Sequence, residues 1–546
     1  MINKKDLACI IILSITSTLL LYKMFHNGIY YSHDGEIHIA RIAQSRLAIQ
    51  DGQLPVRWLG NWNSGYGYPA FMFIYSLPYY VGNIFEVFSL SYEEIFKLLL
   101  LISLVFSSIT FYFLAKKLGN ELAAFIGAIF YISAPYRFAD IYERGALGES
   151  LEFIFIPLLF ITPYIFVKSR SLGFIYTSVT TFLLITTHAI VFAIFLFPFL
   201  IYCYFIFDKK KILFIDILLS IFFGFFLASF QWLPMVFEQR YVDLNKTYFN
   251  LFEGHFISVY QLLRIPNGKI NIGTGIQLGS AQMLILFLSF IIISWQIYKK
   301  QKVHKILLFF MSLSFLCAFL TLDISRSVWL VVRPLQTFLF PWRFLAFTTF
   351  STSVIAVIIL NRIKSNRSKF IFAFILLFIA IFPTRHFLSP DKWYSYNDFY
   401  YENFSDPQNL DNYFLPKGVT HNLNQLQVGN PSIIKGDGTL TVKQKKSNFL
   451  ELNVKLVTAS KIQLHTLYFP GWTLYIDDQK SSYNSSNYPF EGVIVANVPE
   501  GAHNLKLKLT KTHLLGFSDS VTMVAFSLLI LFIIYSQLFI KVKQVT

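Results

Sequence analysis

Ionisable side chains crowd into one short stretch near the start of the chain. The sequence YSHDGEIH at residues 31–38 holds two acids and two histidines within six residues. Asp34 and His38 are four residues apart, so on a helix they would share one face, with Glu36 turned away. Carboxylates and imidazoles are the groups that general acid–base chemistry uses, and a helix N-terminus would stabilise a negative charge on Asp34. The alternative is a solvated helix cap with ordinary polar neighbours, and the motif is too short to indicate a metal site.

A second group of charges lies between residues 134 and 149. It contains Arg137, Asp140, Glu143, Arg144 and Glu149. Long apolar runs flank this group, and charges at the edge of a bilayer are costly unless they pair or face a polar cavity. The density therefore favours a polar site. The alternative is a set of simple surface ion pairs, Arg137 with Asp140 and Arg144 with Glu149.

One further arginine is a candidate site residue. Arg343, in the sequence FPWRF, stands at the predicted outer mouth of an apolar run, where the planar fork of its guanidinium matches a phosphate. Donors from Arg137 or Arg144 would add to the stabilisation of such a charge. The alternative for Arg343 is an interfacial anchor, because Trp and Arg both favour that depth. We interpret His188, in the sequence TTHA, as a residue of a tight turn between two spans.

Long apolar runs supply the elements that must position these groups. Of 546 residues, 55% are hydrophobic and 14% are charged, so a water-soluble fold would lack the polar surface that it needs. Runs of about 17–25 apolar residues predict transmembrane helices. Twelve candidates lie at residues 7–24, 95–115, 121–138, 150–167, 172–187, 189–207, 212–231, 281–298, 306–322, 345–361, 369–384 and 517–540. The sequence thus predicts a polytopic α-helical membrane protein.

The net charge of +16 is explained by basic clusters on one side of the membrane, and it does not indicate binding to nucleic acid. If both chain ends are cytoplasmic and residues 70–90 do not cross, basic clusters such as Lys116–Lys117 fall on the cytoplasmic side, as the positive-inside rule requires. We therefore expect residues 70–90 to form an interfacial or re-entrant segment. The predicted outer loops are residues 25–94, 139–149 and 232–280.

A polar stretch at residues 385–516 is the predicted exported region. Its second half alternates apolar and polar residues in FLELNVKLV, GWTLYIDD, GVIVANV and HNLKLKLT, which predicts antiparallel β-structure. The expected division is a membrane module at 1–384, an extracytoplasmic β-rich domain at 385–516, and a last helix with a cytoplasmic tail at 517–546. All three cysteines lie in apolar runs, so we expect no disulfide in the exported region.

Five spaced motifs, taken in order, resemble those of a known family. They are YSHDGEIH at 31–38, NWNSGYGYP at 61–69, SAPYRFADIYERGALGE at 133–149, FPWRF at 340–344, and FPGW with VPEGAH between 469 and 503. The chain resembles, over almost its whole length, the bacterial YfhO family and relatives labelled as pyruvoyl-tetrahydropterin-synthase-related membrane proteins. The three-histidine zinc site of a soluble pterin synthase has no counterpart in this sequence.

The resemblance implies a GT-C glycosyltransferase fold in the bacterial cytoplasmic membrane. It implies transfer of a sugar from a polyprenyl-phosphate donor to a cell-envelope polymer or lipid acceptor on the outer face, with inversion at the anomeric carbon. By that analogy Asp34 is the catalytic base. We expect Glu143 to be the second catalytic residue, which would orient the sugar or acceptor. The candidate substrate-binding residues are Glu36, His38, Arg137, Arg144 and Arg343. A divalent metal is left open, because the paired acids of metal-dependent members do not map cleanly onto Asp34 and Glu36.

Two other functional classes also fit a chain of this kind. A transporter or lipid flippase needs many spans and intramembrane charges, but transporters commonly show internal repeats, and none is visible between the two halves. A non-catalytic scaffold for envelope assembly would bind polymer and leave the loop acids idle. Replacement of Asp34 by Asn separates the enzyme from the scaffold.

Overall fold

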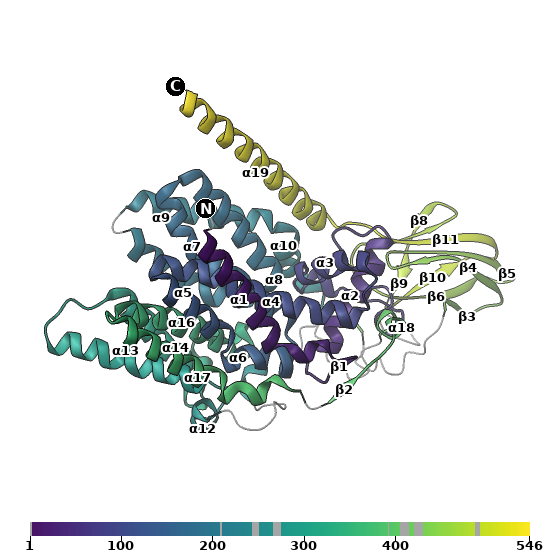
Figure 1. Ribbon diagram of the computed structural model, residues 1–546. Helices are drawn as coiled ribbons and strands as arrows, with labels where there is room; N and C mark the ends of the chain where they lie inside the picture. The colour runs from purple at the N-terminus through teal and green to yellow at the C-terminus, as the bar shows by residue number, and fades with distance from the viewer. Residues whose placement is uncertain are drawn as a thin grey trace.

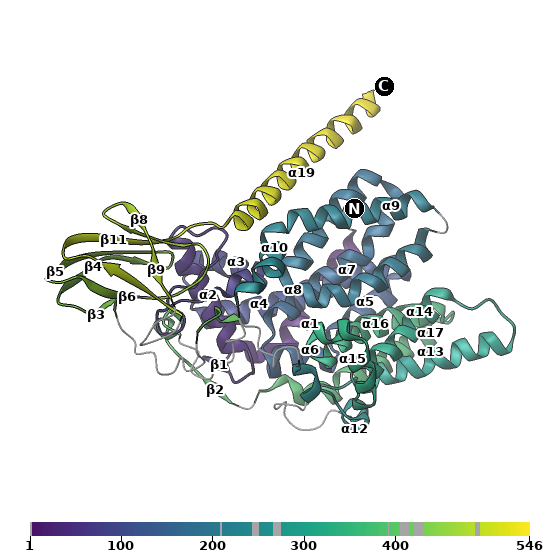
Figure 2. The ribbon, with the colours of Figure 1, turned by 180° about the vertical axis from the view of Figure 1, so that it is seen from behind.

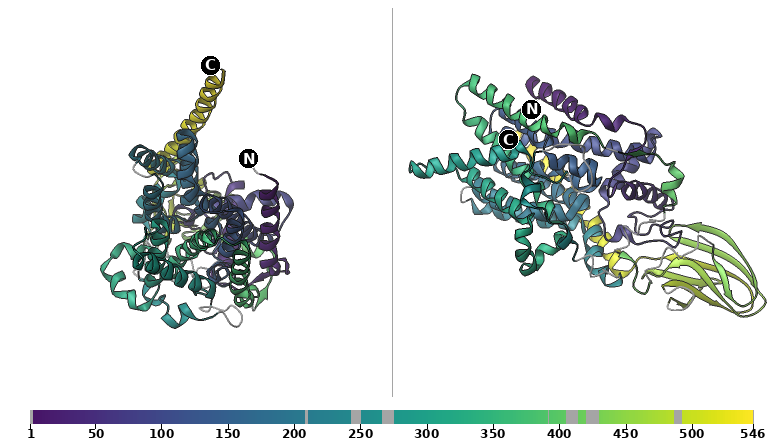
Figure 3. Two further views of the ribbon diagram at one scale, coloured as in Figure 1. Left: turned by 60° about the vertical axis from the view of Figure 1, so that its left-hand side comes forward. Right: turned by 90° about the horizontal axis from the view of Figure 1, so that it is seen from below.

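The computed structural model describes residues 3–207, 210–242, 250–265, 275–390, 392–404, 414–419, 430–485 and 492–545. A bundle of helices forms most of the molecule, and two β-sheets lie at one side of it (Figure 1). Both chain ends lie away from the sheets, and the last helix, α19, projects from the bundle (Figure 2). Seen from below, the sheets extend beyond the helices (Figure 3). The prediction of a polytopic helical membrane protein with a β-rich domain is confirmed.

Each predicted apolar run lies on one or two helices. These are α1 (Lys4–Leu20), α4 (Tyr92–Leu118), α5 (Glu121–Ile132), α6 (Pro135–Phe138), α7 (Leu147–Lys168), α8 (Arg170–Phe207), α9 (Lys211–Leu227), α10 (Ser229–Phe237), α13 (Ser280–Tyr298), α14 (Lys305–Leu320), α16 (Phe344–Arg362), α17 (Asn366–Ile381) and α19 (His513–Val545).

The helices that are long enough to span a membrane are fewer than the twelve runs. By length and hydropathy, seven helices in the described ranges can cross, or up to nine if each of two bent pairs is one span. The bent pairs are α5 with 135–144, at 45°, and α9 with 229–241, at 76°. The difference arises because α1 and α14 have only 17 and 16 residues. In addition, α8 joins two predicted runs in 38 residues, with a break at His188.

The segment at 70–90 contains no helix of spanning length. Its longest helix, α3 (Leu77–Ile84), has eight residues and rises about 12 Å at 1.5 Å per residue, against a hydrocarbon core of about 30 Å. Two short 3₁₀ turns, Ala70–Met72 and Phe85–Phe88, flank it. This part of the chain is therefore a set of short helical turns, and its placement at the interface stays a prediction.

Ion pairs join the basic ends of the first helices. Lys116, at the end of α4, lies 2.5 Å from Asp6 in the first turn of α1. Lys5 lies 3.7 Å from Glu121, the first residue of α5. Since these pairs bring two predicted cytoplasmic clusters together, the beginning of α1 and the end of α4 share one end of the bundle.

The β-rich domain consists of two antiparallel sheets. One has the order β3-β6-β10-β9, and the other has the order β4-β5-β11-β7-β8. The strands are β3 (Ser432–Lys435), β4 (Gly438–Lys446), β5 (Phe449–Leu456), β6 (Ser460–Leu467), β7 (Trp472–Ile476), β8 (Gln479–Ser481), β9 (Tyr483–Asn484), β10 (Val493–Val498) and β11 (Gly501–Leu509). All four segments predicted from alternation form strands.

Several contacts fix the outer loop and the β-rich region to the helices. Strand β1 (Ile29–Tyr30) pairs with β2 (Trp393–Tyr394), and the short helix α18 (Asp398–Glu402) packs on α2 (Gly35–Gln50). A buried ion pair of 2.7 Å joins Arg57 of the loop to Asp519 of α19. Helix α2 is thus held between the bundle and the sheets. The predicted loop at 232–280 lies partly outside the described residues, which omit 243–249 and 266–274.

Candidate active site

Asp34 occupies the N-cap position of α2. Its backbone N–H donates to the carbonyl oxygen of Arg144 at 2.8 Å, and the N–H of His33 donates to that of Glu143 at 3.0 Å. These two bonds join motifs that are more than 100 residues apart in the sequence. The carboxylate of Asp34 makes no capping bond, is partly exposed, and has no side-chain hydrogen bond or ion pair within the described part of the chain. An unpaired carboxylate therefore stands at a helix N-terminus, which stabilises its charge.

Arg144 is the centre of a buried group of charges beside Asp34. One of its terminal nitrogens, NH1, lies 2.8 Å from Asp140 and 2.7 Å from Glu149. Asp140 and Glu149 are at most 1% exposed, and Arg144 is 4% exposed. Asp34 also interacts electrostatically with Arg144. Arg144 therefore pairs with two buried carboxylates and interacts electrostatically with a third, that of Asp34, which has no hydrogen bond or ion pair among the described residues.

Arg343 joins the same group through a shared acid. Its Nε lies 3.5 Å from Glu149, its NH1 donates to the carbonyl oxygen of Phe338 at 2.8 Å, and its guanidinium stacks on Phe340. The hydroxyl of Tyr136 donates to the other oxygen of Glu149. Two arginines from distant segments thus converge on one carboxylate, so their guanidinium groups lie in one buried polar region.

Two other predicted residues have different partners. Arg137 is completely buried, lies over the ring of Phe153 at 3.9 Å and donates to the carbonyl oxygen of Ser150 at 3.2 Å. The alternative of an Arg137–Asp140 surface pair is wrong, because Asp140 pairs with Arg144 four residues later. Glu143 accepts from the backbone N–H of Gly275 at 2.7 Å, so its carboxylate holds the outer loop.

The remaining two predicted residues lie on α2 and point elsewhere. Glu36 accepts from the hydroxyl of Tyr400, so it turns toward α18, as the helical spacing predicts. His38 is buried, and its Nδ1 lies 2.9 Å from the hydroxyl of Tyr79. Burial lowers the pKa of the His38 imidazole well below its usual value, with the positive charges of Arg41 and Arg144 acting in the same direction.

His33 is the titratable neighbour of Asp34 on the loop. Burial lowers the pKa of its imidazole, Asp34 opposes that change, and Arg144 and His255 add to it. A lowered pKa leaves His33 neutral at neutral pH. The adjacent histidine therefore adds no positive charge beside Asp34.

Sequence reasoning gave no role to three acids of this region, although it placed Asp140 and Glu149 in the second group of charges. Asp140 and Glu149 hold Arg144, and Glu152 lies 3.8 Å from His188. Glu149 and Glu152 are three residues apart in α7, a spacing that puts both on one helix face. The signal for Glu152 is its place within the apolar run 150–167, because an acid inside a predicted span indicates a functional site.

No metal site is formed by these acids. Within the described ranges, no group of three or more His, Cys, Asp or Glu side chains is arranged to hold a metal ion. Glu36, the second acid of the motif, is engaged by Tyr400. The residues present therefore do not fit a divalent metal between Asp34 and Glu36.

The shared position of Glu149 leads to a prediction on stability. Glu149→Ala leaves two buried guanidinium groups without their common carboxylate, and removal of one partner of a buried pair costs about 3–5 kcal/mol. We expect a clear drop in the melting temperature of the detergent-purified protein. The matched control is Glu121→Ala, because Glu121 pairs with Lys5 on the surface, where such pairs contribute about 0–1 kcal/mol. Equal melting temperatures for the two variants would contradict the buried network.

The arrangement combines two chemical capacities. Asp34 offers an ionised carboxylate that accepts a proton, which is the requirement for a general base. Arg144 and Arg343 offer donors with positive charge in a region of low dielectric, where they stabilise a developing anion strongly. A base next to two anion-stabilising arginines suits the transfer of a group from a phosphate to a hydroxyl.

Sequence comparison relates the chain to one family. A family model described as the 6-pyruvoyl-tetrahydropterin synthase related domain, a membrane protein, matches residues 71–388. That match contains Arg144, Glu149 and Arg343. No curated protein matches the chain.

Two solved structures are similar to the model in part. The apo crystal structure of the Archaeoglobus fulgidus oligosaccharyltransferase is 12% identical, with a TM-score of 0.40 over 73% of this chain and 56% of that one. The arabinofuranosyltransferase AftD from Mycobacteria is 14% identical, with a TM-score of 0.44 over 70% of this chain and 27% of that one. The chain thus spans about half of the first protein and about a quarter of the second.

Proposed function

The chain belongs to the 6-pyruvoyl-tetrahydropterin synthase related family of membrane proteins, and we propose that it is a membrane glycosyltransferase of the GT-C type. It moves a sugar from a polyprenyl-phosphate donor to a cell-envelope acceptor on the outer face of the bacterial cytoplasmic membrane. The observation that carries this proposal is the unpaired carboxylate of Asp34, bonded through its backbone to Arg144.

Asp34 acts as the base in this mechanism. Its carboxylate takes the proton of an acceptor hydroxyl while the hydroxyl oxygen forms a bond to the anomeric carbon of the donor sugar. The bond from that carbon to the phosphate oxygen breaks, and its electron pair stays on the leaving polyprenyl phosphate. Attack opposite the leaving group inverts the anomeric carbon.

The arginines stabilise the leaving group. The departing lipid phosphate gains negative charge as the bond breaks, so donors near it lower the energy of the transition state more than that of the ground state. Arg343 and Arg144 are the candidates for this role. They come from different segments, and both contact Glu149, so their guanidinium groups lie in one region. Glu143 acts as a positioning residue through its bond to Gly275.

In the proposed orientation of the protein in the membrane, both chain ends lie in the cytoplasm. The ion pairs at the beginning of α1 and the end of α4 support the placement of these basic helix ends on one side of the membrane. Asp34 follows the opposite end of α1. Polyprenyl chains and membrane lipid then lie beside the short turns of residues 70–90. The β-rich domain lies outside, next to α2.

This orientation predicts which positions a membrane-impermeant maleimide reaches. In a background with the three native cysteines replaced by serine, Asp437→Cys on the β-rich domain should react in intact cells. Lys302→Cys should react only after lysis, although both side chains are exposed on the protein. Reaction of Lys302→Cys in intact cells would reverse the orientation or add a crossing at 70–90.

The direct test of the function is transfer of label in isolated membranes. Polyprenyl-phosphate sugars with a labelled sugar are the donors, and label in envelope polymer or lipid is the product. The decisive variant, Asp34→Asn, is argued in the Discussion.

A further inference from the structure

A polar cleft lies between the membrane module and the β-rich domain, at the opposite end of α2 from Asp34. The end of α2, the loop at Gly60–Asn61 and the β4–β5 hairpin form its walls, around a volume of about 200 Å³. Closed small-molecule pockets are larger, about 300–1,000 Å³. The size fits one or two units of a longer polymer.

The walls of the cleft are held together before any ligand binds. The backbone N–H of Ser447 in the hairpin donates to Asp51 at 2.6 Å, and the side chain of Gln53 donates to the Ser447 hydroxyl at 2.8 Å. A side chain at Gly60 would meet the Ser447 backbone at 2.5 Å. The hairpin therefore rests directly on the loop, and only glycine permits this approach.

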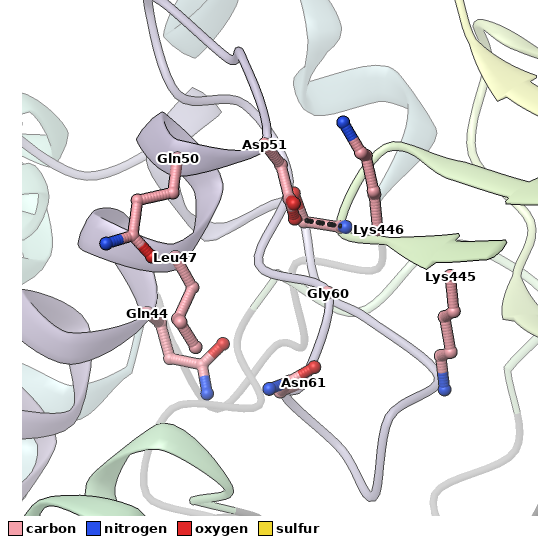
Figure 4. A pocket seen from close by; sticks show the side chains of 9 residues that line it. Gln44, Leu47, Gln50, Asp51, Gly60, Asn61, Lys445 and Lys446 are labelled. Atoms are coloured by element: carbon pink, nitrogen blue, oxygen red, sulfur yellow. Dashed lines mark hydrogen bonds between the residues drawn. The ribbon is translucent and has the colours of Figure 1, made fainter.

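The floor of the cleft presents acceptors for hydroxyl groups. The amide nitrogens of Gln44 and Asn61 both donate to the carbonyl oxygen of Glu402, at 2.6 and 3.0 Å. This fixes which end of each amide faces the cleft, so the two amide oxygens are left for a ligand. Figure 4 shows Gln44 and Asn61 extending toward one another across the gap. Oriented amide oxygens of this kind accept hydrogen bonds from sugar hydroxyls.

Positive charge lies on the hairpin side of the cleft. Lys445 and Lys446 follow one another on the edge strand β4, so their side chains point in opposite directions, as Figure 4 shows. Both are exposed, and neither makes a side-chain hydrogen bond or ion pair with any residue that the structure describes. By contrast, Lys443 on the same strand pairs with Glu451 at 2.8 Å. Asp51 accepts from a neutral backbone N–H and keeps its charge, so two lysines against one carboxylate leave the lining of the cleft net positive.

We propose that this cleft binds an anionic saccharide segment of the acceptor. Carboxylate or phosphate groups of the saccharide meet Lys445 and Lys446 on the hairpin, and its hydroxyl groups meet Gln44 and Asn61. Helix α2 has 16 residues and is about 24 Å long at 1.5 Å per residue, so a polymer of several units reaches from the cleft to Asp34. The inference rests on the proposed function for the identity of the ligand as an acceptor.

Binding of defined oligosaccharides to the full-length protein in detergent tests the cleft. The probes are a galacturonate hexamer, a mannose hexamer with phosphate monoesters, and a neutral mannose hexamer, titrated at low and high salt. We expect an anionic probe to bind and the neutral one to bind far more weakly. Binding of one anionic probe alone identifies its group, carboxylate or phosphate, as the ligand.

Lysine substitutions supply the matched comparison. Lys445→Gln with Lys446→Gln should weaken binding roughly tenfold, which corresponds to about 1.4 kcal/mol, whereas Lys443→Gln should leave it nearly unchanged. No sugar donor is present, so the assay measures binding alone, and a failure of transfer is separate from a failure of binding. Equal binding of the neutral probe, no binding of either anionic probe, or equal effects of the double variant and Lys443→Gln would overturn the proposal.

Discussion

Asp34→Asn should lower sugar transfer by about 10²–10⁴-fold, the contribution that a positioned general base makes. The amide has the size of the carboxylate and is an equally good N-cap residue, but it does not accept the proton. Because the carboxylate makes no hydrogen bond or ion pair with described residues, the amount of protein in the membrane and its melting temperature should not change. Initial rates of label transfer from a polyprenyl-phosphate sugar measure the loss.

The control for this prediction is the same chemical change at another acid of the outer loop. Glu86 forms an ion pair with Arg46, and its side chain is 36% exposed, so Glu86→Gln should keep nearly full activity. A variant Asp34→Asn that is as active as Glu86→Gln would remove Asp34 from the mechanism.

The same pair of variants separates the rival functions. A scaffold that only binds polymer makes no labelled product, and its assembly phenotype would not depend on the basicity of Asp34. A transporter or flippase would move its substrate across the membrane without forming a glycosidic bond. Product that forms with the parent protein and is lost with Asp34→Asn is therefore expected from the enzyme alone among these classes.

The predictability of the strands depended on how each is buried. Strands β5 and β11 have one buried and one exposed face over much of their length, so Leu505 and Leu507 alternate with lysines. Alternation is the signal of a half-buried strand. Strand β4 is exposed at nearly every position and β6 is buried at nearly every position. Each alternates over only about five residues, TLTVK at 439–443 and KIQLH at 461–465, and both were missed.

The candidate site was predictable where it depends on local geometry. The spacing of Asp34, Glu36 and His38 placed Asp34 at a helix start and Glu36 on another face, as the structure has them. The ion-pair partners were predictable only in part, because Arg144 pairs with Glu149 as the alternative of simple pairs has it, but both side chains are buried. Asp140 and Arg144 are one helical turn apart and pair, whereas Arg137 turns onto Phe153, a residue of the next helix.

The cleft at the far end of α2 lay beyond sequence reasoning for a different reason. Its walls come from α2 and from a hairpin that is nearly 400 residues later in the chain. Nothing in either segment specifies the other. The glycine that permits their contact, Gly60, reads in the sequence as an ordinary loop residue.

Arg343 is the second position at which we expect a large effect on transfer. Arg343→Ala removes a donor that stabilises the leaving phosphate, and loss of one such donor costs about 10²–10³-fold in turnover. Arg343→Lys keeps the positive charge but loses the planar fork that holds Glu149 and the Phe338 carbonyl together. Because lysine does not reproduce that geometry, we expect an intermediate loss, roughly tenfold.

A comparison of the two substitutions distinguishes a phosphate-binding arginine from an interfacial anchor. An anchor requires only a long basic side chain at the right depth, so lysine would restore full activity and membrane insertion alike. Arg326 is an exposed arginine that contacts Glu253 on the same outer side, and Arg326→Lys serves as the matched control. We expect Arg343→Lys to lower kcat at saturating acceptor while the amount of inserted protein stays equal to that of Arg326→Lys. Full turnover in both Arg343 variants would show that Arg343 is only an anchor. Of the two arginines in the mechanism, Arg144 alone would then remain to stabilise the leaving phosphate.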